Sequence, residues 1–322
     1  MAWLPDRQVY GPERPTVRDV EPLNRVFSEA FTDRYRRDGM SGVRVPHLNP
    51  AIWRYALEDA GDGAMIWRDA DGELCGFSIV HLSGREGWMG PLAVRPDRQG
   101  NGLGKTMIRA GIAWLKDRGA RTIGLETMPR TIENIGFYSR LGFVPGHLTI
   151  TLTRDLGRRP ALHPEVLSTA GPGRAARLEA CRALTDRLCP GTDFTRELAA
   201  TADLRIGDTL LLRDGEADVV GFALYHTAPL AVGRPQDELR VLKLVAEDEE
   251  TFERLMAAAE AAALAADIRR VSVRCQTAFG RAYLRLIHLG YRTHWTDLRM
   301  TLEGHPERAV PEGAVLWSNW EI

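Results

Sequence analysis

The chain has 322 residues, which is long enough for two ordinary domains that each bury a core of their own. Its 42 Lys and Arg residues balance 43 Asp and Glu residues, and the net charge of -1 gives no electrostatic footprint for nucleic acid or an anionic membrane. There is no run of about 18 apolar residues, and the first ten residues lack the plan of a signal peptide. We therefore expect a cytoplasmic protein that binds neither nucleic acid nor membrane, with its oligomeric state left open.

The predicted elements alternate in type, which favours a mixed α/β fold. A short strand at 16–18 is expected to lead into a helix that has Asp19 as N-cap and Pro22 in its first turn. The next apolar runs, 64–67 and 74–82, predict a hairpin because Asp-Gly lies between them.

Residues 87–94 are predicted to form the following strand, in which Gly90-Pro91 predicts a bulge or a splayed edge. A glycine-rich loop comes next, followed by apolar residues at helical spacing up to about Arg118. The module then closes with a strand, a helix and a last strand, expected at 121–128, 131–141 and 147–156.

The second half repeats this plan. "CGFSIVH" from residue 75 matches "VGFALYH" from residue 220, and "RTIGLETM" from residue 121 matches "RRVSVRCQ" from residue 269. These matches predict two modules, 12–156 and 160–304, with a linker around 155–164. The tail, 305–322, is expected to add an edge strand anchored by Trp317 and Trp320.

The loop "RPDRQGNGLGKT", residues 95–106, nearly spells two phosphate-binding motifs. A Walker A loop needs glycine where Gln99 stands, and a dinucleotide fingerprint needs glycine where Lys105 or Met107 stands. What remains is a Gln-x-x-Gly-x-Gly loop between a strand and a helix. The first turn of such a helix offers unpaired N-H groups and the positive end of the dipole, which suits a pyrophosphate.

The first module resembles the GCN5-related N-acetyltransferase (GNAT) family, through "GPLAVRPDRQGNGLGKTMI" and "NIGFYSRLGF" at a fitting distance. The resemblance implies two tandem acyl-CoA N-acyltransferase-like modules of α/β (α+β) class, each a mixed, splayed central sheet flanked by helices. It also implies that acetyl-CoA binds as acyl donor, with its pantetheine arm between strands that splay around Val94 and Leu125. The implied cofactor-binding residues are Leu92, Ala93, Val94, Arg98, Gln99, Gly100, Asn101, Gly102, Leu103, Gly104, Lys105, Asn134 and Tyr138.

The implied reaction is attack of a neutral amine on the thioester. Main-chain N-H groups of residues 92–94 match the family's oxyanion donor, and Tyr138 matches its acid for the departing thiolate. For the general base, Glu126 is preferred to Glu86 and His81 because it is expected to point into the module near the splay, although a water chain is an alternative. An acidic acceptor or a plain solvated helix face explains Arg34, Arg36 and Arg37 equally well.

The second module is expected to keep the fold but not to bind coenzyme A. Carboxylates at 247–250 replace the glycine loop, where they would cap a helix and repel a diphosphate. Ala282 and Leu286 stand at the positions of Asn134 and Tyr138. The cysteines, Cys75, Cys181, Cys189 and Cys275, have no ligand spacing, so buried thiols are expected and no metal.

The sequence thus predicts an N-acetyltransferase that moves acetyl from acetyl-CoA to a primary amine through a ternary complex. A non-catalytic acyl-CoA-binding sensor or interaction module is the alternative, and an ATP or GTP enzyme ranks third because the first P-loop glycine is missing. The acceptor is not identified, and neither is the acyl chain length.

Overall fold

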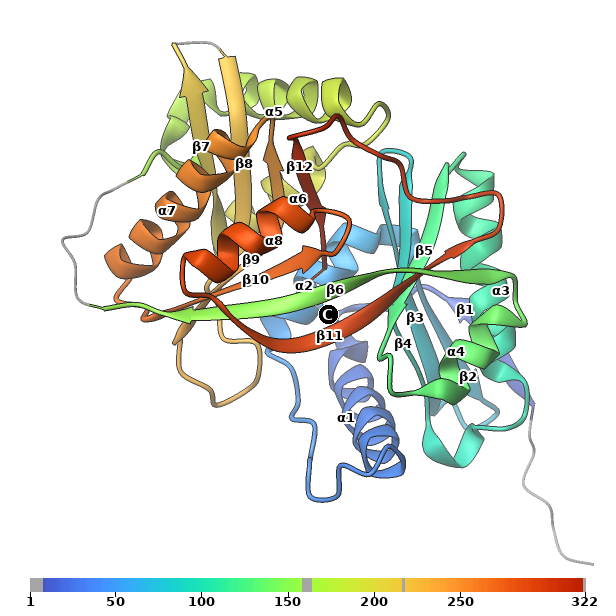
Figure 1. Ribbon diagram of the computed structural model, residues 1–322. Helices are drawn as coiled ribbons and strands as arrows, with labels where there is room; N and C mark the ends of the chain where they lie inside the picture. Colours follow the sequence, from blue (N-terminus) through green and yellow to red (C-terminus); the bar gives the residue numbers. More distant parts are fainter. Residues whose placement is uncertain (1–7, 158–163, 216–217, 321–322) are drawn as a thin grey trace, which may run out of the picture.

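The computed structural model describes residues 8–157, 164–215 and 218–320 (Figure 1). Most of the linker expected at 155–164 lies outside these residues. Within them, no helix is both long and apolar enough to cross a membrane.

The first module carries a sheet with helices on both faces, as its alternating pattern predicts. Helices α1 and α2 pack on one face through a core that includes Leu23, Trp53 and Phe77. Helix α3 covers the other face through Ile108 and Leu115. The elements are β1 Val9–Glu13, α1 Val20–Arg37, α2 Pro50–Ala60, β2 Ala64–Asp69, β3 Leu74–Ser83, β4 Glu86–Val94, α3 Leu103–Asp117, β5 Thr122–Thr127, α4 Ile132–Ser139 and β6 Phe143–Asp155.

The second module repeats this order, which confirms the internal repeat. Its helix α7 occupies the place of α3, and α8 the place of α4. The elements are α5 Arg174–Leu188, α6 Thr195–Leu204, β7 Gly207–Asp214, β8 Asp218–His226, β9 Glu238–Ala246, α7 Glu249–Ala265, β10 Arg270–Gln276, α8 Gly280–His288, β11 Arg292–Leu302 and β12 Val315–Ser318.

The two modules exchange their last long strands. The sheet runs β1-β2-β3-β4-β5-β11-β6-β10-β9-β8-β7, so β11 of the second module pairs with β5 of the first. Strand β6 of the first module in turn pairs with β10 of the second. Figure 1 shows β6 and β11 crossing the centre of the molecule side by side. The boundaries 12–156 and 160–304 remain predictions about the sequence repeat, because the spatial halves share these strands.

The sequence predicted that the tail would lie on an edge of the sheet, but the tail does not lie on either outer edge. Strands β9 and β10 pair in parallel only up to Val241 and Val273. Beyond that point β9 pairs with β12 instead, from Lys243 onward. The tail therefore fills the place where β9 and β10 separate, and Trp317 and Trp320 are buried there as the expected anchors.

The first expected strand was wrong. Residues 17–19 form a 3-10 turn, in which the Thr16 hydroxyl accepts from the N-H of Arg18 and the Asp19 carboxylate accepts from the N-H of Thr16. This exchange of hydrogen bonds fixes a helical turn, and it explains why a pattern that looked extended does not join the sheet. The strand lies earlier, in β1, which pairs with β2.

Candidate active site

The glycine loop leaves the start of α3 uncapped. Gly102 is the N-cap residue with φ +85°, and no side chain makes a capping hydrogen bond there. Gly100 has φ +80°, and open space lies where a Cβ would stand on either glycine. Because the first-turn N-H groups of a helix have no intrahelical acceptor, this end of α3 offers donors and a positive dipole end to an anion.

Arg98 holds the loop in place instead of reaching outward. Its guanidinium donates to the buried Asp69 carboxylate at 2.7 Å, and Arg95 donates to the same carboxylate. Burial raises the pKa of Asp69, but the N-H of Glu73 and the two arginines outweigh it and hold that pKa below its usual range. Lys105, in the first turn of α3, is exposed. Of the two predicted cationic side chains, Lys105 is thus the one that projects from the loop into solvent.

Strands β4 and β5 pair only at their beginnings. The last residues in register are Met89 and Leu125, and β4 then continues to Val94 without its neighbour. On the other side of β4, the register with β3 shifts at Gly90-Pro91, which confirms the predicted bulge. The predicted splay around Val94 and Leu125 therefore begins directly after Leu125.

Two of the three predicted main-chain groups of β4 face this gap. The N-H of Arg95 donates to the carbonyl of Cys75 in β3. Since successive residues of a strand turn their N-H groups to opposite sides, Ala93 also faces β3. Leu92 and Val94 face away from β3, toward the gap, and the Gln99 side chain donates to the Val94 carbonyl at 3.0 Å.

Helix α4 carries Asn134 and Tyr138. Neither of them, nor any other residue of this helix, is fully buried. Phe137 and Tyr138 pack edge to face, with ring centroids 5.2 Å apart. Burial raises the pKa of Tyr138 to about 12, so its hydroxyl keeps its proton at neutral pH and is available as a donor. The placement of Tyr138 as acid and of Asn134 at the pantetheine remains a prediction.

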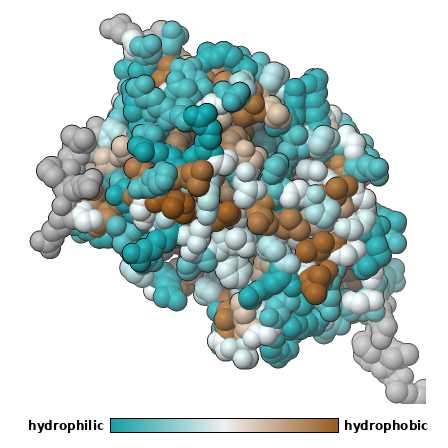
Figure 2. Space-filling model, in the orientation of Figure 1, coloured by the Kyte–Doolittle hydropathy of each residue, from teal (hydrophilic) through white to brown (hydrophobic). Residues whose placement is uncertain are grey.

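Apolar side chains gather over α4 and α8 on the face seen in Figure 2. Ile132 at the start of α4 is 78% exposed, and Leu284 in α8 is 56% exposed. The two helices differ in how far their inner faces are buried. Ala282 and Leu286 of α8 are fully buried, whereas no residue of α4 is fully buried. Helix α4 therefore keeps an apolar surface beside the loop.

Glu126 is held by cations from the other module. Its carboxylate accepts from Thr149 at 2.6 Å, from Arg274 at 2.5 Å and from Arg299 at 3.2 Å. Burial raises the pKa of Glu126, but Arg274 and Arg299 outweigh this and hold it below its usual range. A carboxylate with a lowered pKa is a weak base, so these contacts favour a positioning role, and the base assignment stays an untested prediction.

No pattern in the sequence pointed to this cluster of Glu126, Arg274 and Arg299. Arg299 is 1% exposed, stacks on Trp88 at 3.8 Å and belongs to the exchanged strand β11. Arg274, from β10, also donates to Asp297 at 2.8 Å. Both arginines lie far from Glu126 in the chain, and their approach depends on the strand exchange, which no local pattern encodes.

Of the two weaker base candidates, His81 is occupied and Glu86 lies away from the gap. In His81, Nδ1 lies 2.5 Å from the Asp59 carboxylate and Nε2 lies 3.1 Å from the Gly90 carbonyl. Both ring nitrogens face oxygen acceptors, so neither is left to take a proton from a substrate. Glu86 accepts from the Trp88 indole at 2.8 Å at the very start of β4, before the strands separate.

The arginines of α1 are paired with neighbouring acids. Arg34 bonds Asp38 and also Glu133 of α4, at 2.9 Å. Arg36 and Arg37 both pair with Asp33. These contacts favour a solvated helix face for Arg36 and Arg37, whereas the half-buried Arg34 joins α1 to α4. Among the described residues, no group of three or more His, Cys, Asp or Glu side chains is placed to hold a metal ion.

The second module has lost each of these features. Asp248 caps α7 by accepting from the N-H of Thr251 at 2.7 Å. Ion pairs join the start of α7 to α8, Glu249 with Arg281 and Glu253 with Arg285. The gap between β9 and β10 is filled by β12.

These features define the class of protein, a tandem of two modules with an acyl-CoA acyltransferase fold. The first module keeps the uncapped loop and the open gap, and the second has closed both. The comparisons agree, since residues 24–143 match the model of the acetyltransferase (GNAT) family. This match lies within the first module.

Its relatives match over parts of their length. The chain is 30% identical over 133 residues to a mycothiol acetyltransferase of Kytococcus sedentarius, which is 40% of this chain and 44% of that protein. It is 40% identical over 78 residues to a mycothiol acetyltransferase of Streptomyces coelicolor, which is 24% of this chain and 25% of that protein. The chain thus spans less than half the length of these curated relatives.

The fold itself is matched along the whole chain. A solved tandem GNAT protein from the clavulanic acid biosynthesis pathway superposes with a TM-score of 0.59, covering 94% of this chain and 99% of that one. The identity is 13%, so this likeness concerns the fold alone.

Proposed function

We propose that the chain is an acetyl-CoA-dependent N-acetyltransferase with one working site, in the first module. The observation that carries this proposal is the uncapped start of α3 at Gly102, beside a gap that Leu92 and Val94 face. Anion-binding amides and free strand groups lie next to each other there. That combination suits a diphosphate joined to a chain of amides, which is the chemistry of coenzyme A.

In this proposal the main chain of residues 99–104 binds the pyrophosphate, Lys105 adds charge and Arg98 clamps the loop to Asp69. The pantetheine amides pair with β4 and with Asn134. The acetyl group then ends where β4 and β5 begin to separate, near Leu125. Helix α4, with no fully buried residue, would be covered by the coenzyme.

The reaction is direct attack in a ternary complex. The amine nitrogen bonds to the thioester carbon, an N-H group of residues 92–94 binds the oxyanion, and the carbon-sulfur bond breaks. Tyr138 gives its proton to the departing thiolate, and the proton lost by the amine leaves through a water chain. Glu126, engaged by two arginines, orients the surrounding strands in this scheme.

The acceptor is a primary amine of unknown identity. A panel should contain small amines, amino acids, amine antibiotics and peptide N-termini. Mycothiol precursors belong in it as well, because matched relatives bear that name.

Titration calorimetry with acetyl-CoA, and separately with ATP, tests the proposal. One acetyl-CoA site per chain, no ATP binding, and release of the coenzyme A thiol with one member of the amine panel support it. Absence of acetyl-CoA binding would overturn it.

The alternative is a sensor or interaction module that binds acyl-CoA without turnover. It is favoured by the occupied state of Glu126 and His81, which leaves neither side chain open to a substrate proton. Tight acetyl-CoA binding with no thiol release across the whole panel would support this alternative over the enzyme.

A further inference from the structure

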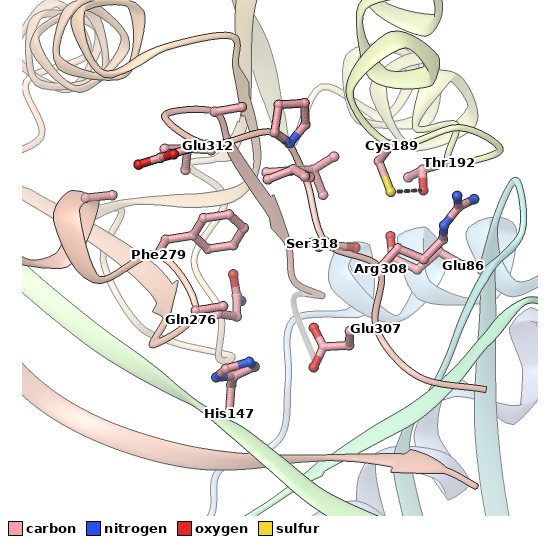
Figure 3. Close-up of a pocket in the computed structure, with 18 of the residues that line it drawn as sticks. Glu86, His147, Cys189, Thr192, Gln276, Phe279, Glu307, Arg308, Glu312 and Ser318 are labelled. Carbon is pink, nitrogen blue, oxygen red and sulfur yellow. Dashed lines mark hydrogen bonds between the residues drawn. The ribbon is translucent and has the colours of Figure 1, made fainter. Parts of the chain in front are cut away.

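A cavity of about 400 Å³ lies between the modules, away from the glycine loop and α4 (Figure 3). Its walls come from β4, β6, β10 and β11, and from the segment 303–314 that leads to β12. Figure 3 shows Gln276, Glu307 and His147 pointing into a common space from three of these elements.

Arginines and glutamates line the cavity in equal number, but Arg85, Arg281 and Arg308 are exposed, and Arg281 pairs with Glu249. On the inner wall, the half-buried Glu86 and Glu307 lie beside one buried cation, Arg299. The only ion-pair partner of Glu307 among the described residues is Arg299, at 3.1 Å, and Arg299 also serves Glu126. Burial raises the pKa of Glu307, Arg299 lowers it in part, and the neighbouring Glu86 raises it further. Glu86 and Glu307 thus face the cavity, and the one guanidinium that pairs with Glu307 also pairs with Glu126.

Two buried acceptor atoms on this wall lack a hydrogen-bond partner among the described residues. They are Oε2 of Glu86 and Oε1 of Gln276, whose side chain is 2% exposed. The amide of Gln276 is fixed, because its Nε2 donates to Asn319 at 2.6 Å while Asn319 itself donates to the Arg274 carbonyl. A buried acceptor without a donor costs about 1–3 kcal/mol, which a donating ligand would recover.

We propose that this cavity binds a small organic cation, a protonated primary amine with a short apolar body. An ammonium group supplies N-H donors and the positive charge that the two carboxylates lack. Phe279, Val310 and Leu316 line the same cavity, and they suit an apolar body and a cation near an aromatic face. A metal ion fits less well, since the described residues offer no group of three ligating side chains.

This proposal does not rest on the acetyltransferase function, because binding is measured without acetyl-CoA. Phenethylamine and n-hexylamine are titrated into the protein at pH 7.5, each beside its neutral alcohol, 2-phenylethanol or 1-hexanol. One amine site per chain is expected, with an affinity at least about 10-fold above that of the alcohol. Equal affinity of amine and alcohol overturns the proposal.

Substitutions at the lining carboxylates test whether the amine binds in this cavity. Glu86→Gln should weaken amine binding by about 10-fold, and Glu307→Gln serves as a second variant should the first unfold. Glu312→Gln is the matched control, because it removes the same charge from an exposed side chain that Figure 3 shows turned away from Glu86 and Glu307. Equal weakening by Glu312→Gln overturns the assignment of the ammonium group to Glu86 and Glu307. Displacement of the amine by saturating coenzyme A shows that the amine binds elsewhere and overturns the proposal.

Discussion

Glu126 and Arg274 occupy equivalent positions in the two modules, 148 residues apart, and form a salt bridge with each other. Thr149 and Asp297, also 148 residues apart, lie on either side of this pair and bond Glu126 and Arg274 respectively. A repeated position that meets its own counterpart cannot keep one charge, because two buried carboxylates would repel. Opposite charges at these equivalent positions join the two modules here.

Glu126→Gln should destabilise the chain by about 3 kcal/mol, because it leaves Arg274 and Arg299 with too little negative charge around them. Thermal and urea unfolding measure the loss. Glu133→Gln is the control. Glu133 is exposed and pairs with Arg34, so this substitution should lower the free energy of unfolding by less than about 1 kcal/mol. The pH profile of kcat/KM should keep its shape in Glu126→Gln, and disappearance of its acidic limb would restore Glu126 as the base.

Gly102→Ala should weaken acetyl-CoA binding by more than about 10-fold, because an alanine at φ +85° strains the loop by about 1–2 kcal/mol and places a methyl group over the amides. Gly119→Ala is matched to it, at φ +71° beyond the other end of α3, with open space around its Cβ position. Both variants should lose similar stability. Calorimetry should show weaker coenzyme binding only for Gly102→Ala.

Tyr138→Phe should lower kcat by about 100-fold and leave the KM for acetyl-CoA nearly unchanged, because only the proton to the thiolate is lost. Tyr283→Phe changes a half-buried tyrosine of the equivalent helix α8 and should have no effect. Initial rates with the accepted amine measure both. A normal kcat in Tyr138→Phe removes the acid role.

Glu197 makes stability depend on pH. Burial, and then the nearby Asp59, raise its pKa to about 7 from a usual 4.5. The folded state therefore holds this proton more tightly than the unfolded chain, so the stabilising contribution is complete below about pH 4.5 and is lost as the pH rises through 7. Relative to Glu197→Gln, the natural chain should lose about 3 kcal/mol between pH 4.5 and 8.

Urea unfolding of both chains at pH 5 and pH 8 checks this difference. Glu179→Gln, an exposed carboxyl on α5, should run parallel to the natural chain. Parallel curves for Glu197→Gln as well would show that the proton on Glu197 is not linked to folding.

Trp317→Ala should destabilise the chain by about 3–5 kcal/mol, because Trp317 is fully buried and packs edge to face on Phe252 at 5.4 Å. Leu284→Ala, at a side chain 56% exposed, should cost less than about 0.5 kcal/mol. Denaturant midpoints give both values. A small loss for Trp317→Ala would mean that β12 is not an integral part of the second module.

Features set by local backbone preference were predictable from the sequence. The glycines at 100 and 102 need positive φ, and Gly90-Pro91 breaks a ladder, so the loop and the bulge follow from residue type. Asp248 caps α7 for the same kind of reason. The internal repeat was visible because matching strands keep similar apolar patterns.

Features set by partners distant in the chain were not predictable. The pattern of "TITLT" in β6 marks a strand, but it does not say that the strand will pair with β10 and not with β5. The choice of Glu126 as base failed to anticipate its arginines for the same reason. The position of β12 depends on a gap that exists only after β9 and β10 have assembled.

The exchange of β6 and β11 has a consequence for the ancestry and handling of this chain. A pair of single-module subunits that swapped their final strands would have the same strand order, and joining them end to end would give this protein. A fragment cut between the modules would lose β11 from beside β5 and keep an unpaired β6. Such a half should associate with a second copy of itself, because each module needs the last long strand of the other to complete its sheet.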